Sequence, residues 1–126
     1  LLIAALLTPD QVGSLGGLAN ELGLAVLAEV HNARELEEVL SSDVGLIGVN
    51  NRDLDSFEVD LDTTARLAPL VGGSRTVVSE SGIETGDDVR TVCEAGADAI
   101  LVGESLLRST DRQQKMAELM SAGRVG

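Results

Sequence analysis

The sequence is poor in residue types on which several classes of protein depend. Among its 126 residues there is one cysteine and one aromatic residue, Phe57, and nine basic residues stand against 21 acidic ones. A single cysteine excludes a disulfide framework and suits a reducing compartment, so we expect a cytoplasmic protein. The scarcity of aromatic residues disfavours platforms that stack bases or sugars. The net charge of −12 disfavours nucleic acid and anionic membranes as partners.

Several motifs are also missing. No apolar run approaches the ~18 residues of a membrane-spanning helix, and the opening LLIAALL lacks the basic flank and cleavage site of a signal peptide. No GxGxxG or P-loop pattern follows an expected strand, no cysteine, histidine and acidic cluster has metal-ligand spacing, and no Ser-His-Asp arrangement is evident. Because the chain opens at Leu1 inside an apolar run, we expect it to be an internal stretch of a longer polypeptide.

Five near-continuous apolar runs predict parallel strands buried on both faces, separated by amphipathic helices with recognisable start signals. The strands recur about every 20 to 30 residues, which is the pace of repeated βα units. We therefore expect residues 1–126 to form one α/β domain of about five parallel βα units. A doubly wound open sheet is the alternative, and the missing nucleotide-binding motifs count against it. The expected strands are Leu1–Ala5, Leu24–Val30, Val44–Asn50, Thr76–Glu80 and Asp98–Val102; the expected helices follow Thr8, Asn32, Asp60 and Thr85, with a short one at Glu104–Leu107 and a last one at Asp111–Met120.

Polar residues collect where these strands end, at the edge where parallel βα proteins bind ligands. Glu29 and Glu80 each close an apolar run, so each carboxylate needs a polar partner or a function. Asn50 and Arg52 follow the third strand, and the Arg52 guanidinium can bind a carboxylate or a phosphate. The structural alternatives are an ion pair for Glu29 and turn geometry for the asparagine. We interpret His31 as a loop hydrogen-bonder rather than a catalyst.

Two glycines end the last two expected strands, within Val77–Arg108. Gly82 follows TVVSES, Gly103 follows ADAILV, and a helix start lies behind each. Two bare backbone turns before helix N-termini present clustered N–H groups, which is an arrangement that suits an anion. In an eightfold barrel the loops after strands seven and eight commonly hold a phosphate.

The set AEVH, IGVNNRDLDSFEVDLDTTARLAP, VSESGI and GADAILVGESLLR strongly resembles the indole-3-glycerol phosphate synthase family. The resemblance runs from Leu1 to the last helix. It implies a (β/α)8 TIM barrel of which this chain supplies strands four to eight, with strands one to three absent. It also implies conversion of 1-(2-carboxyphenylamino)-1-deoxyribulose 5-phosphate to indole-3-glycerol phosphate with loss of CO2 and water, in tryptophan biosynthesis and without a metal or organic cofactor.

The resemblance assigns a role to each polar residue at the strand ends. It implies catalytic roles for Glu29, Asn50 and Glu80, with Glu29 as an acid/base carboxylate and Asn50 orienting the substrate. Arg52 would face the anthranilate carboxylate. The remaining contacts it implies are Ser81 to the ribulose-derived hydroxyls and Gly82, Gly103 and the Glu104 backbone to the phosphate. Position 104 is often small in the family, so its glutamate fits a backbone contact and would repel the phosphate through its side chain.

The catalytic lysine of the family lies on the strands that this chain lacks. The sequence has only Lys115, in the last helix and away from the strand ends. We therefore expect the separate chain to be inactive and to need the missing N-terminal half of the barrel as its partner. Two unpaired sheet edges should also make it associate, swap or unfold. The alternatives are another phosphate-binding barrel enzyme, such as phosphoribosylanthranilate isomerase, or a non-catalytic phosphate-binding half-barrel module.

Overall fold

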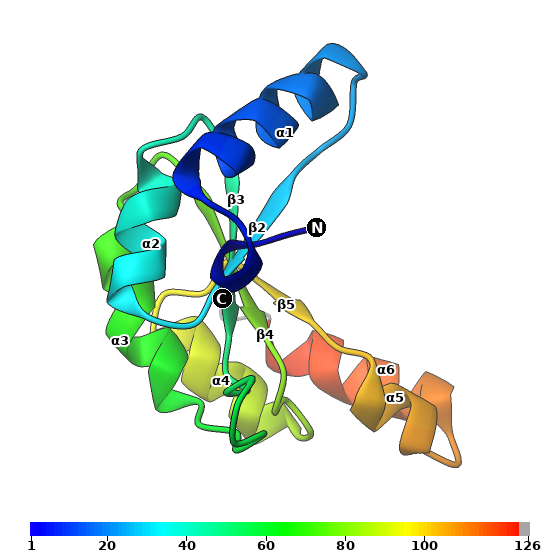
Figure 1. The fold of residues 1–126 in the computed structure, drawn as a ribbon. Coiled ribbons are helices and arrows are strands. Elements are labelled where there is room, and N and C mark those ends of the chain that lie inside the picture. The colour runs from blue at the N-terminus through cyan, green and yellow to red at the C-terminus, as the bar shows by residue number, and fades with distance from the viewer. Residues whose placement is uncertain (124–126) are drawn as a thin grey trace.

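A computed structural model describes residues 1–123 and shows one parallel five-stranded sheet (Figure 1). Strand order follows chain order from β1 to β5, and every neighbouring pair is parallel. The strands are β1 (Leu2–Ile3), β2 (Leu27–Val30), β3 (Leu46–Asn50), β4 (Thr76–Glu80) and β5 (Ala99–Leu101).

Helices connect the strands, and most begin where the capping residues predict. Thr8 and Thr85 each form a capping box, and the Asn32 side chain accepts a hydrogen bond from the N–H of Glu35. The helix expected after Asp60 begins at Asp62, with Leu61 at the cap position, and Asp60 Oδ1 accepts from the Asp62 N–H at 3.0 Å. The helices are η1 (Ala4–Leu6, a 3-10 turn), α1 (Pro9–Glu21), α2 (Ala33–Leu40), α3 (Asp62–Val71), α4 (Gly86–Glu94), α5 (Glu104–Arg108) and α6 (Arg112–Ala122).

The two faces of the sheet differ in what covers them. Helices α1 to α4 form an arc along one side, and α5 and α6 follow beyond β5 (Figure 1). Toward these helices the strands point fully buried side chains, among them Val30, Ile47 and Val49. The alternate residues face the other side, where Val78 is only partly buried and Leu101 is 51% exposed. The helix-free face is therefore open to solvent.

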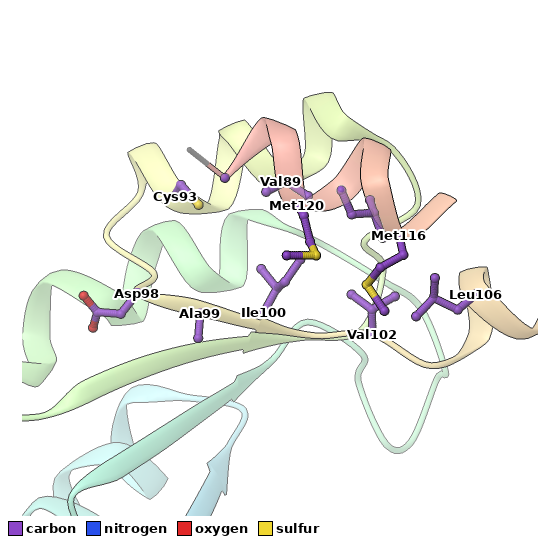
Figure 2. Close-up of a pocket in the computed structure, with 11 residues that line it drawn as sticks. Val89, Cys93, Asp98, Ala99, Ile100, Val102, Leu106, Met116 and Met120 are labelled. Carbon is purple, nitrogen blue, oxygen red and sulfur yellow. The ribbon is translucent and has the colours of Figure 1, made fainter. Parts of the chain in front are cut away.

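An apolar cavity of about 310 Å³ lies on the helix-covered side of the edge strand β5. Met116 and Met120 of α6 point toward Ile100 of the strand and Val102, which follows it (Figure 2). Cys93 of α4 also lines this cavity and is partly buried. The cavity lies on the face opposite the one to which Glu29 and Glu80 point.

Several elements differ in extent from the prediction. The first apolar run is a strand for two residues only, because Ala4–Leu6 turns into the 3-10 helix. The last helix continues to Ala122, beyond the expected Met120. Residues 124–126, which follow the last expected helix, lie outside the described residues. None of the helices in residues 1–123 has the length and apolar character that a bilayer crossing requires.

The alternation of strands and helices confirms the α/β class. A doubly wound sheet reverses its strand order at a switch point, whereas β1 to β5 succeed one another without reversal. Sequential parallel strands with helices along one face are the arrangement of an eightfold βα barrel. The described chain therefore forms a partial α/β barrel of five βα units.

Candidate active site

The predicted site residues meet at the carboxyl-terminal edge of the sheet. Strand register pairs Glu29 with Gly48 and Asn50 with Glu80. Because register partners in a parallel sheet point to the same side, Glu29, Asn50 and Glu80 share the helix-free face. The predicted convergence of these three residues is thus present in the structure.

Two buried carboxyl groups form the centre of the site. Glu29 is 6% exposed and Glu80 is 4% exposed. Burial raises the pKa of Glu80 to about 7, with the charge of Glu29 and a hydrogen bond to its carboxyl group adding to the effect. Near neutral pH Glu80 can therefore hold a proton, which makes it a potential proton donor beside Glu29.

Asn50 connects this pair to the neighbouring loop. Its Nδ2 donates to Glu29 Oε1 at 3.1 Å, and its Oδ1 accepts from the backbone N–H of Arg52 at 3.0 Å. Both ends of the amide are thereby fixed in direction. Asn50 therefore shapes the turn after β3 and also binds the Glu29 carboxylate.

Gly48 makes room for the carboxyl pair, and sequence reasoning missed it. A Cβ at this position would overlap the Glu80 carboxyl group, so only glycine fits here without displacing it. The signal in the sequence is a glycine that interrupts the apolar strand LIGVN. Which group approaches that glycine depends on the β3–β4 register, which the sequence alone does not provide.

Arg52 lies on the other side of the site and is held by three contacts. Its Nη2 pairs with Glu104 Oε2 at 3.0 Å, its Nη1 donates to the Phe57 carbonyl at 3.3 Å, and its backbone forms a bridge with Val59. The other oxygen of Glu104 pairs with Arg108 at 2.8 Å. The Glu104 side chain is therefore engaged by two arginines.

A cavity of about 300 Å³ separates Arg52 from the two glycine turns. Gly82 has a φ of 76°, and a Cβ there would overlap Val59, so both conformation and space require glycine. Ser81 before it also has a positive φ, of 66°. By contrast, Gly103 has a φ of −124° and nothing lies within 4 Å of an added Cβ. Ser105, in the same lining, donates to the carbonyl of Ile83.

Asn51 fixes the strained turn at Ser81 and was not selected from the sequence. Its Nδ2 donates to Ser79 Oγ at 3.0 Å and to the Ser81 carbonyl at 3.1 Å. Its Oδ1 accepts from both the N–H and the hydroxyl of Thr64. Asn51 is 2% exposed and thus joins β3, β4 and α3 behind the site.

The sequence matches the family model of indole-3-glycerol phosphate synthase over residues 1–119. The chain belongs to this synthase family. Indole-3-glycerol phosphate synthase of Dehalococcoides mccartyi strain 195 is 48% identical over 120 residues, which is 95% of this chain and 46% of that protein. The synthase of Chromobacterium violaceum is 46% identical over 122 residues, 97% of this chain and 46% of its own length. The chain thus spans about half the length of the curated relatives it matches.

Solved structures agree on the fold. Thiamine phosphate pyrophosphorylase from Pyrococcus furiosus superposes with a TM-score of 0.74 at 20% identity, covering 91% of this chain and 56% of that one. Mandelate oxidase with benzoyl-formic acid gives a TM-score of 0.72 at 24% identity, over 93% of this chain and 39% of the other. At such identities the likeness concerns the barrel fold alone. The family match does not favour the isomerase or half-barrel module alternatives.

Lys115, the one lysine of the sequence, lies on α6 and is paired with residues near it. Its Nζ donates to the Glu84 carbonyl at 3.0 Å and to Glu118 Oε2 at 2.8 Å. The hydrogen bond from Lys115, and then one from the Gly86 N–H, lower the pKa of Glu118. Lys115 lies closer to the loop after β4 than the sequence suggested, yet its ammonium group is already paired there.

Proposed function

We propose that this chain is the carboxyl-terminal part, strands four to eight, of a barrel that makes indole-3-glycerol phosphate. The reaction converts 1-(2-carboxyphenylamino)-1-deoxyribulose 5-phosphate by ring closure, decarboxylation and dehydration, which makes the complete enzyme a carbon–carbon lyase. The observation that carries the proposal is the buried Glu29–Glu80 pair beside an arginine-lined cavity, in a chain of the synthase family. A cytoplasmic location belongs to the same proposal and is supported by the lone Cys93.

The carboxyl pair suits the proton transfers of this reaction. Ring closure needs a proton at a carbonyl oxygen as the ring carbon attacks, and dehydration later needs one at a departing hydroxyl. Glu80, with its pKa raised to about 7, can hold a proton at the pH of the reaction. Glu29 would remain ionised to orient and tune the lysine acid, which we assign to the part of the relatives that this chain does not match.

The opposite wall suits the two anionic ends of the substrate. Arg52 offers a planar guanidinium for the anthranilate carboxylate, and we place the phosphate at the turns of Gly82, Gly103 and the Glu104 backbone, with Ser81 on the ribulose-derived hydroxyls. The Glu104 carboxylate is turned onto Arg52 and Arg108, which supports a backbone contact rather than a side-chain contact. Fixing both ends brings the ring carbon to the carbonyl, a large part of the catalytic effect. No cofactor enters the proposed chemistry.

The complete gene product that contains these residues provides the test. We expect steady-state formation of indole-3-glycerol phosphate from the carboxyphenylamino substrate, followed by indole fluorescence. The 126-residue chain by itself should give no measurable turnover. A folded complete product that lacks this activity but isomerises phosphoribosylanthranilate would overturn the proposal.

A further inference from the structure

Glu29 lies between two unsatisfied polar atoms. Among the described residues, the buried side-chain atoms without a hydrogen-bond partner are His31 Nε2 and Glu80 Oε1. Both atoms belong to neighbours of Glu29, since His31 Nε2 is 3.2 Å from Glu29 Oε1 and Glu80 interacts with the Glu29 carboxyl group. Buried polar atoms without partners are rare. A protonated Glu80 can donate to the Glu29 carboxylate, so His31 Nε2 is the atom that calls for a functional explanation.

The ring of His31 is fixed from behind by Glu35. Glu35 Oε2 lies 3.1 Å from His31 Nδ1 and accepts from the His31 backbone N–H at 2.8 Å. The other oxygen of Glu35 accepts from Asn32 Nδ2 at 2.7 Å, and Asn32 in turn caps α2. The start of α2 thus determines where the His31 ring lies. The His31 side chain is 11% exposed.

One imidazole therefore stands between two carboxylates. A neutral ring has a single N–H, so whichever nitrogen carries it, the other presents a lone pair to an acidic oxygen. Only the doubly protonated ring can donate to Glu35 and Glu29 together. Nε2 and Glu29 Oε1 are close enough for this second bond but not yet aligned for it, and a small rotation of either group would form it.

The other groups around the ring are also acidic. Asp53 faces it from the loop after β3, where N–H groups of Ser56 and Asp55 chiefly lower the pKa of Asp53 and the His31 charge contributes least. The cavity of about 260 Å³ that His31 lines contains Glu58 and Asp60 too, and its one arginine, Arg66, is paired with Asp60. The charged groups near the ring are therefore mainly acidic and complement a cationic ring.

We propose that His31 is a positioning residue, whose protonated ring keeps Glu29 ionised and directed toward the substrate. The inference rests on the proposed synthase activity, in which Glu29 acts as a carboxylate. Sequence reasoning treated His31 as a loop hydrogen-bonder, and the contact with Glu35 agrees with that. The approach to Glu29 adds the second role.

The pH dependence of kcat/KM in the complete gene product separates the effect of the positive charge at His31 from the effect of the shape of its ring. His31→Gln removes the charge, so Glu29 takes up its proton more readily and the acid limb should move up by about one pH unit, with about tenfold lower kcat/KM at the foot of that limb. His31→Lys removes the ring but keeps a positive charge, and its acid limb should not move up. Glu35→Gln should shift the limb in the same direction as His31→Gln.

Glu38→Gln is the matched control, because Glu38 lies on the same helix in an exposed pair with Arg34 and should leave the profile unchanged. Equal shifts in His31→Gln and His31→Lys, or no shift in either, would overturn the inference. An inactive wild type would instead contradict the proposed function.

If the wild type is inactive, ring ¹⁵N chemical shifts still test His31, the one histidine of these 126 residues. Glu29→Gln should move the ring titration to lower pH, and an unchanged titration would refute the coupling.

Discussion

At the scale of single residues, Glu80 couples the site to the stability of the fold. Its pKa is about 7 in the folded chain and 4.5 as an ordinary glutamate, so the fold favours the protonated form. A raised pKa means that the Glu80 contribution to stability is complete below about pH 4.5 and is lost as pH rises toward 7. We predict that Glu80→Gln abolishes this loss and raises the free energy of unfolding at pH 8 by up to about 3 kcal/mol.

Melting temperatures of the complete gene product, as wild type and as Glu80→Gln, between pH 4.5 and 8.5 would show the effect. The two curves should coincide at the acid end and separate as the pH rises. Glu37→Gln, at an exposed position of α2, should follow the wild type throughout. A Glu80→Gln curve that stays parallel to the wild type at every pH would contradict the buried pair.

Gly48 has a role that only the neighbouring strand reveals. Gly48→Ala would force the Glu80 carboxyl group out of its position, with a cost of about 1–3 kcal/mol in unfolding free energy. The loss in kcat/KM, expressed as a free energy, should exceed the loss in unfolding free energy, because Glu80 moves with respect to Glu29. Gly45→Ala is the matched control, since its added Cβ meets nothing within 4 Å. Chemical denaturation of both variants in the complete gene product tests this, and wild-type stability for Gly48→Ala would contradict it.

The sequence could predict those site residues that are marked by their immediate neighbours in the chain. It could not predict contacts between residues that are distant in sequence. Glu29 and Glu80 stand out because each is an acid at the end of its own apolar run. The pair of Arg52 with Glu104 joins residues 52 positions apart, and no local pattern announces it. His31 shows the same limit, because its distance from Glu29 depends on how the loop after β2 turns into α2.

At the scale of elements, Asn51 holds the loop after β3 against β4 and α3. We predict that Asn51→Ala costs about 2–4 kcal/mol, because it leaves Thr64 and Ser79 buried with fewer partners and frees the turn at Ser81. Asn20→Ala, at an exposed position of α1, should cost far less. Urea unfolding of both variants in the complete gene product measures the difference, and equal costs at the two positions would contradict the role of Asn51.

The elements themselves were largely predictable, and their differences have physical causes. Caps at Thr8, Asn32 and Thr85 are local hydrogen bonds, so the helix starts follow from a few adjacent residues. The first strand is shorter than its apolar run, because the run pairs only with β2 and Ala4–Leu6 is free to turn. Apolar character predicts burial, but strand length also depends on partners distant in sequence.

At the scale of the whole molecule, the open sheet predicts self-association. In residues 1–123, β1 and β5 each pair on one side only, and the helix-free face exposes Leu101. Exposed strand edges recruit further strands. The 126-residue chain should therefore sediment as dimers or larger species, or melt without cooperativity. A monodisperse monomer with a sharp melting transition would contradict this expectation.

We propose that this chain supplies the carboxyl pair and the anion-binding wall, whereas the acid lysine comes from the rest of the barrel. The most direct measurement joins these 126 residues to the part of the Dehalococcoides mccartyi synthase that they do not match, and follows indole-3-glycerol phosphate formation. We predict turnover by the joined protein, none by the 126-residue chain, and a loss of at least about 100-fold in kcat for the joined protein with Glu29→Gln. A folded joined protein without activity, or one in which Glu29→Gln has no effect, would contradict the account.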